Sequence, residues 1–207
     1  MRAQLRALAA TLMAALVLQS CGGGPAGWRG RVPSRPMPVG AFALPEAGAG
    51  AAPPLFHFRA RPRCALLVYF GYVSCPDACP TTLTDVRRVL RALGPDSARV
   101  DLAFATVDPG RDTPQVLVPY LHHFVPAGHA LVPGRDEQLA AVQVAFGATS
   151  NVTRTRTGEV TVSHTGDLYL VDPRGEVAVI WRFGTKWQDV AEDLRLFLAK
   201  QAQKAQQ

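Results

Sequence analysis

A short apolar, aromatic-rich run restricts the fold of this chain more than any other feature. Residues 65–72 read ALLVYFGY, with Arg63 before them and a Pro-containing loop after them. A continuous apolar run of this length, rich in aromatic and branched residues, is typical of a buried strand. Any fold for the chain therefore has to place this segment inside a sheet and cover it with other elements.

Helical and extended segments alternate after this strand. Leu83, Val86, Leu90 and Leu93 recur at helical spacing and Gly94 follows as a stop signal, which predicts an amphipathic helix beyond the loop. Asp112-Thr113-Pro114 supply a cap and a first-turn proline for a helix that runs to about 124, after a strand over 100–107. A helix over 135–146, strands over 167–171 and 177–182, and a last helix over about 187–199 are expected to follow. This order predicts a thioredoxin-like α/β fold, in which helices flank a mixed sheet and a β-hairpin lies near the C-terminal end.

The first 21 residues have the pattern of a bacterial lipoprotein leader. A basic start precedes an apolar run over 7–18, and its 12 residues are fewer than the ~20 that a membrane-spanning helix needs. The letters LQSC at 18–21 resemble a lipobox, whose cysteine is acylated. We expect a signal peptide over 1–20 and a lipid on Cys21 that holds the protein on the bacterial cell membrane. An uncleaved anchor and an ordinary signal peptide are the alternatives, and both also place the domain in the periplasm or at the cell exterior.

The rest of the chain divides into a tether, one domain and a tail. Residues 21–38 are rich in Gly, Pro and Arg and lack apolar periodicity, which predicts a flexible tether. One thioredoxin-like domain is expected over 39–200, followed by a polar tail over 201–207. The net charge of +6 comes from basic residues spread along the chain, so the sequence does not favour nucleic-acid binding.

Two cysteines, Cys75 and Cys79, stand in the loop that leaves the first strand and enters a helix. We expect Cys79 at the helix cap and Cys75 just outside it, where free backbone N–H groups lower the pKa of a thiol. A plain disulfide is one alternative, since such bonds are common in exported proteins. A structural zinc site is another, although it usually needs four ligands and no second cysteine pair is present near the first.

Three residues separate these cysteines, rather than the two of the thioredoxin redox motif. With this spacing both sulfurs can face one ion. Thiolates favour a soft cation such as Cu(I), and an added imidazole would also suit Cu(II). The third ligand then has to come from another part of the chain.

Five histidines could supply that ligand. His122 and His123 lie together on a predicted helix that needs a polar face, and they are interpreted as solvated residues. His57 and His129 lie in weakly structured stretches and receive no role. His164 differs because it stands in a loop immediately before the predicted hairpin, although a histidine in such a place is more often a surface residue than a ligand.

Several blocks of the sequence together resemble the Sco/SenC family. These blocks are Phe70-Gly71-Tyr72, Cys75 to Leu83 (CPDACPTTL), Val107-Asp108-Pro109 with Arg111 to Pro114 (RDTP), and Ser163-His164 followed by Tyr169 to Gly175 (YLVDPRG). Their order and separations also match, and the resemblance covers roughly residues 39–199. It implies a thioredoxin-like fold, copper held by Cys75, Cys79 and His164, and a part in building the binuclear copper centre of cytochrome c oxidase.

Three further residues are interpreted with this resemblance in view. Asp77 and Asp108 match recurring family positions, and we expect them to shape loops or to support the ligands rather than bind the metal. Cys64 departs from the family pattern, and an unpaired cysteine beside a strand is expected to be buried and inert.

The resemblance leads to two functional hypotheses. The first is a membrane-anchored copper metallochaperone that hands its ion to the copper-accepting subunit of cytochrome c oxidase. The alternative is a thiol–disulfide oxidoreductase in which Cys75 and Cys79 form the redox-active pair and reduce the acceptor's metal-binding cysteines. A thioredoxin-like reductant or another copper chaperone is a further expected partner. A peroxidase is less favoured, because it has no use for His164 as a ligand.

Overall fold

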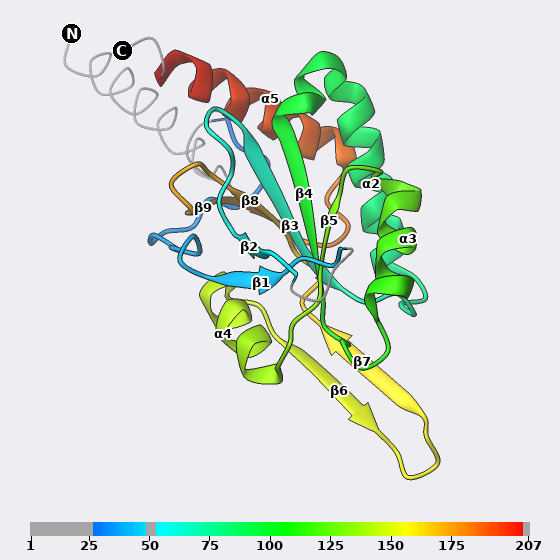
Figure 1. The fold of residues 1–207 in the computed structure, drawn as a ribbon. Helices are drawn as coiled ribbons and strands as arrows, with labels where there is room; N and C mark the ends of the chain where they lie inside the picture. The colour runs from blue at the N-terminus through cyan, green and yellow to red at the C-terminus, as the bar shows by residue number, and fades with distance from the viewer. Residues whose placement is uncertain (1–26, 49–52, 205–207) are drawn as a thin grey trace, which may run out of the picture.

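A five-stranded sheet forms the centre of the computed structural model, which describes residues 27–48 and 53–204 (Figure 1). The strands follow one another across the sheet in the order β5-β4-β3-β8-β9. Their bounds are β3 (Ala65–Gly71), β4 (Val100–Thr106), β5 (His129–Leu131), β8 (Leu168–Val171) and β9 (Val177–Trp181). Strand β4 is parallel to β3 and β5, whereas β8 is antiparallel to β3 and β9. The predicted mixed sheet and its C-terminal hairpin are therefore both present.

Helices cover the two faces of this sheet. They are α2 (Ala78–Leu93), which the short 3₁₀ helix η1 (Gly94–Arg99) follows, α3 (Pro114–Phe124), α4 (Asp136–Phe146) and α5 (Trp187–Lys204). Helices α2 and α3 connect successive parallel strands, and right-handed crossovers place both on one face, where α5 packs beside α2 (Figure 1). Helix α4 lies on the opposite face together with the small antiparallel pair β1 (Ala43–Pro45) and β2 (Leu55–His57).

Strand β3 is buried along its whole length because both of its faces are covered. Neighbouring side chains of a strand point to opposite faces. The Tyr69 ring packs 5.8 Å from the ring of Phe104 on the face that carries α2 and α3. The Phe70 ring packs on the other face, 5.4 Å from the ring of Phe146 in α4. This two-sided burial explains why the sequence of the strand shows no polar alternation.

A second hairpin, β6 (Ser150–Arg154) and β7 (Val160–His164), forms a separate two-stranded sheet that extends away from the domain (Figure 1). Its residues are all half-buried or exposed, so it lacks the apolar signal of the other strands. The sequence analysis did not predict it. His164 is consequently the last residue of a strand, and not part of a loop as expected.

Part of the predicted tether over 21–38 is packed against the domain. Arg31 and Ile180 each donate a backbone N–H to the other's carbonyl oxygen, at 2.9 and 2.8 Å, beside the edge strand β9. Pro38 forms a second bridge near the β8–β9 turn. From residue 27 onward the segment therefore extends the edge of the central sheet instead of forming a free linker.

The predictions for the two ends of the chain fall only partly within the residues that the structure describes. The signal peptide over 1–20 and the lipid on Cys21 lie outside the described residues. Within the described part of the chain, no helix combines the length and the apolar character needed to cross a bilayer. At the other end, residues 201–204 of the predicted polar tail continue α5 as helix.

The buried carboxylate of Asp193 holds the N-terminal segment against α5 and β9. It accepts the backbone N–H groups of Arg29 and Gly30 and the indole N–H of Trp181, each at 2.8 Å. We predict that Asp193→Ala lowers the free energy of unfolding by about 3 kcal/mol, because three donors lose their acceptor. Denaturant unfolding measures this loss. Exposed Glu192 is the control: Glu192→Ala should change the free energy by less than about 0.5 kcal/mol, and equal losses for both variants would contradict this role of Asp193.

Candidate metal centre

The structure brings Cys75, Cys79 and His164 together. One ligand atom from each residue lies within 4.8 Å of the other two, and Cys79 Sγ is 3.7 Å from His164 Nε2. Both cysteines are free thiols. Cys79 is fully buried, whereas 8% of Cys75 is exposed and His164 is half-buried. The sulfur of Cys79 is therefore the innermost ligand of the group, and Cys75 and His164 lie nearer to the solvent.

The two cysteines are positioned by the junction between β3 and α2. Helix α2 begins at Ala78 with Asp77 as its N-cap, so Cys79 lies inside the first turn and not at the cap as predicted. Gly71 ends β3 directly beside this turn. A Cβ atom at Gly71 would lie 2.9 Å from Cys79 Sγ and 2.9 Å from the Phe104 ring, so only glycine allows the sulfur to pack this close to the strand.

Burial decides the ionisation of Cys79. It raises the pKa of the Cys79 thiol to about 12, although the sequence analysis expected the helix N-terminus to lower it. The Tyr69 hydroxyl lies 3.8 Å from Cys79 Sγ as a hydrogen-bond donor, and the Cys79 backbone N–H donates to Cys75 Sγ at 3.3 Å. The free protein therefore holds Cys79 as a neutral thiol at pH 7, and a metal has to displace its proton.

His164 is oriented for metal binding by its other ring nitrogen. Since a carbonyl oxygen can only accept, Nδ1 carries the proton and donates it to the Thr165 carbonyl at 3.0 Å. Nε2 then presents a lone pair on the side of Cys79. Burial lowers the pKa of His164, which keeps the imidazole neutral at pH 7. The rings of Tyr69 and Tyr72 pack edge-to-face on the imidazole, with centroids 6.2 and 5.7 Å away.

The carboxylate of Asp112 holds the cysteine loop by a hydrogen bond from the loop backbone. As expected from Asp112-Thr113-Pro114, this stretch supplies the cap and the first-turn proline of α3, with Thr113 as the N-cap and Pro114 as the first helical residue. The buried Asp112 side chain accepts the Val73 backbone N–H at 3.0 Å and the Thr106 hydroxyl at 2.6 Å. Burial raises the pKa of Asp112. This residue ties the loop to the end of β4.

Asp108 links the hairpin that carries His164 to the core. Its carboxylate is 2% exposed and forms ion pairs with Arg111 and with Arg154, the latter at 3.2 Å. Arg154 belongs to β6, the partner strand of β7. The loop-shaping role expected for Asp108 thus extends to the hairpin. Asp77, the other acidic residue singled out, is exposed and accepts the Thr81 hydroxyl at 3.2 Å.

The remaining histidines lie apart from this group in the described part of the chain. His122 and His123 are exposed on α3. His57 is in β2 and His129 in β5, where its ring is 2.6 Å from a Glu46 carboxylate oxygen, so neither lies in a weakly structured stretch as predicted.

Cys64, the third cysteine among the described residues, is a free thiol and is buried as predicted. Tyr69, Tyr72, Thr106 and Arg154 received no role from the sequence. Thr106 alone carried a usable signal, because it is a buried polar residue at the end of an apolar strand.

Two sulfurs and one imidazole nitrogen form a ligand set for a soft cation. Three ligands leave a coordination position open, unlike the four of a closed structural zinc site. The thiols are not joined in a disulfide. The residues present therefore fit a copper ion that can be reached by a further ligand.

Comparison with known sequences gives one family. The model described as SCO1/SenC matches residues 58–199. A Stutzerimonas stutzeri protein named for copper binding is 38% identical over 112 residues, which is 54% of either chain. A SCO2-like protein of Rickettsia felis is 41% identical over 80 residues, which is 39% of this chain and 38% of the relative. The chain thus spans about half the length of the first relative and less of the second.

Solved structures give the same result. The ScoI protein of Bradyrhizobium japonicum with copper bound is 30% identical, with a TM-score of 0.64 over 79% of this chain and 98% of that one. The apo Sco1 protein of Thermus thermophilus is also 30% identical, with a TM-score of 0.69 over 84% and 99% of the two chains. Together with the mixed sheet described above, these matches confirm the predicted thioredoxin-like fold.

The Asp108–Arg154 ion pair should control how firmly the β6–β7 hairpin is held. We predict that Arg154→Ala raises the hydrogen-exchange rates of the hairpin amides about fivefold, since an ion pair of this exposure contributes about 1 kcal/mol. Native-state hydrogen exchange measures the effect. The control is Arg156→Ala in the hairpin turn, whose side chain takes part in no ion pair among the described residues. Equal rates in Arg154→Ala and the unmodified protein would show that other contacts hold the hairpin.

Proposed function

The chain belongs to the SCO1/SenC family, and from that premise we propose that it binds one copper ion through Cys75, Cys79 and His164 and delivers it to the copper centre of cytochrome c oxidase. The observation that carries the proposal is the convergence of the three ligand atoms within 4.8 Å. The copper in the Bradyrhizobium ScoI structure supports the choice of metal. Copper is the cargo of this protein and not a resident cofactor.

The layered arrangement of the ligands suits transfer by ligand exchange. Cys75 and His164 lie on the solvent side, whereas Cys79 is fully buried. An incoming ligand of the acceptor can replace the two outer ligands first, while the ion stays attached to Cys79. The proton that copper displaced from Cys79 returns when the last bond breaks, and the high pKa of that thiol favours release.

We further propose that the domain works on the outer side of the bacterial cell membrane, held by a lipid on Cys21. This part rests on the leader and lipobox of the sequence. The acceptor is the copper-binding subunit of the oxidase, and another copper chaperone is the proposed source of the ion. Since backbone contacts at Arg31 and Pro38 dock this part of the chain on the domain, residues 31–38 would not act as a free linker to the lipid.

A thiol–disulfide oxidoreductase is the second candidate, which the two free thiols favour. The accessible sulfur of Cys75 would attack an acceptor disulfide, forming a mixed disulfide and releasing one acceptor thiolate. Cys79 would then attack Cys75 and release the second acceptor thiol. Two electrons pass to the acceptor, and a thioredoxin-like reductant would restore the oxidised pair. The cysteines can bind copper only while reduced, so the two candidate functions are coupled.

The role of His164 tests the first function. We predict that the protein loaded with Cu(II) shows thiolate-to-copper absorption and that His164→Ala weakens copper binding at least tenfold, because the ion loses its only nitrogen ligand. Visible absorption and competition with a chelator measure both quantities. His123→Ala, which removes an exposed imidazole on α3, should leave them unchanged. Unaltered copper binding in His164→Ala would refute the three-ligand site.

The unequal burial of the two thiols tests the second function. We predict that Cys79→Ser forms a lasting mixed disulfide with an oxidised fragment of the acceptor, because Cys75 can still attack but nothing resolves the product. Cys75→Ser should not react, since Cys79 is buried and its pKa is raised to about 12. Mass spectrometry detects the adduct. If neither variant forms an adduct and the unmodified protein loses no free thiols, the oxidoreductase hypothesis is wrong.

A further inference from the structure

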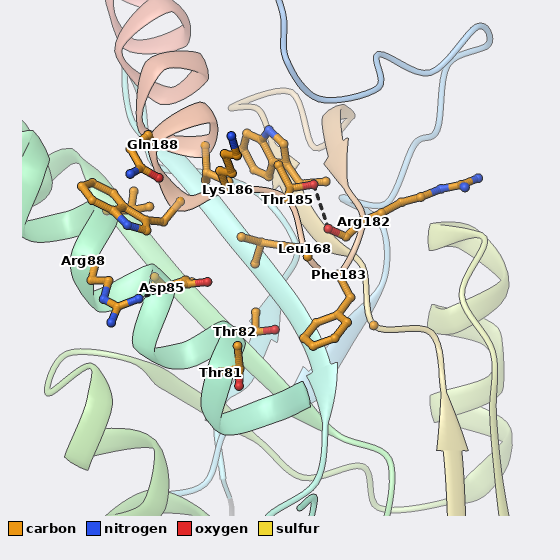
Figure 2. Close-up of a pocket in the computed structure, with 17 residues that line it drawn as sticks. Thr81, Thr82, Asp85, Arg88, Leu168, Arg182, Phe183, Thr185, Lys186 and Gln188 are labelled. Atoms are coloured by element: carbon orange, nitrogen blue, oxygen red, sulfur yellow. Dashed lines mark hydrogen bonds and ion pairs between the residues drawn. The ribbon is translucent and has the colours of Figure 1, made fainter. Parts of the chain in front are cut away.

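A pocket of about 230 Å³ lies beside the metal centre, between α2 and the segment that joins β9 to α5 (Figure 2). We call it the anchor pocket. Its walls are largely apolar: Leu168, Trp181, Phe183 and Trp187 are large apolar residues of the lining, and Thr81 and Thr82 line it from α2. Nothing in the metal site accounts for it, because none of the three ligands lines it.

Two of the segments that line the anchor pocket also hold the ligands. Thr81 and Thr82 follow Cys79 in the first turn of α2, and Leu168 comes four residues after His164. One helical turn rises only about 5.4 Å. A protein that reaches a copper ion at this site would therefore lie close to Thr81, Thr82 and Leu168 of the pocket.

Phe183 is the most unusual residue of the pocket, because 48% of this large apolar side chain is exposed. Figure 2 shows its ring directed toward Thr82. The turn that carries it is held by its own hydrogen bonds: Thr185 donates its backbone N–H and its hydroxyl to the Arg182 carbonyl, at 3.0 and 2.8 Å. The position of Phe183 is thus fixed by the local backbone and not by burial. Exposed aromatic residues beside an apolar pocket are typical of protein-binding sites.

The charged residues around the pocket are mainly basic. Arg88 and Lys186 contribute two positive charges and Asp85 one negative charge, whereas Figure 2 shows the Arg182 side chain directed away from the pocket, which leaves a net charge of +1. Asp85 is already paired with Arg88 at 2.9 Å. A partner with carboxylates next to its apolar contact would complement this rim.

We propose that the anchor pocket is the docking site of the copper-accepting protein, which inserts one large apolar side chain and places carboxylates against the rim near Lys186. This inference rests on the proposed function. Ligand exchange requires the acceptor's ligands to come within bonding distance of the ion, and a stable contact covers about 800 Å² on each partner. The pocket lies within that area and offers the deep apolar contact on which affinity depends.

The test compares pocket variants with matched controls on the full-length protein. Phe183→Ala removes the exposed ring and Lys186→Glu reverses a rim charge. The controls are Val144→Ala and Arg135→Glu, which change exposed residues in and next to α4 on the opposite face of the sheet. The acceptor is the purified soluble copper-centre domain of a cytochrome c oxidase. Calorimetry measures its binding without copper, and absorption measures the rate of copper transfer.

Phe183→Ala should weaken acceptor binding at least tenfold. At low acceptor concentration it should slow copper transfer to the acceptor by the same factor. Lys186→Glu should slow association at low salt, with the difference disappearing at high salt. Copper loading should stay unchanged in all variants, and the controls should behave as the unmodified protein.

The outcomes separate the docking site from the proposed function. If the unmodified protein transfers copper and both pocket variants do so at the same rate, the docking site is wrong and the proposed function stands. If the unmodified protein binds the acceptor without transferring copper, and the pocket variants weaken that binding, the proposed function is wrong and the docking site stands. If the unmodified protein neither binds nor loads the acceptor, both are wrong.

Discussion

The approach of the His164 imidazole to the buried sulfur of Cys79 is the contact on which the rest of this account depends. The two residues are 85 positions apart in the sequence, yet Nε2 and Sγ are separated by 3.7 Å. Three features make the contact possible: a glycine at the end of β3, the first turn of α2, and the β6–β7 hairpin, after which the chain enters β8 of the central sheet. The charged and hydrogen-bonding residues beneath the site hold these elements in register.

Burial gives this site its chemical character. An ionised thiolate at the position of Cys79 would be costly without a cation, so the free protein keeps a neutral thiol there. A bound copper ion removes that cost by supplying the missing positive charge. The same burial makes the two cysteines unequal, since 8% of Cys75 is exposed and Cys79 is fully buried. Metal release and thiol exchange would therefore both begin at the outer sulfur.

Much of the fold could be predicted because burial leaves a clear pattern in β3, β4 and the amphipathic helix α2. The β6–β7 hairpin could not, since its side chains are half-buried or exposed and its sequence reads as a polar loop. The sequence placed the three ligands in one site only through resemblance to a family. The sequence could not reveal the hydrogen bond between the Val73 backbone N–H and the Asp112 carboxylate or the raised pKa of Cys79. Both depend on packing between segments that are distant in the sequence.

The proposed metal binding and the proposed docking are linked, because the start of α2 and the segment from His164 to Leu168 contribute to both sites. In the proposed copper site, two sulfurs and one imidazole nitrogen share a single ion. X-ray absorption at the copper edge of the loaded protein tests this coordination most directly. The account predicts a coordination shell of two sulfur atoms and one nitrogen with the multiple-scattering pattern of an imidazole. A shell of sulfur alone, without that pattern, would contradict it.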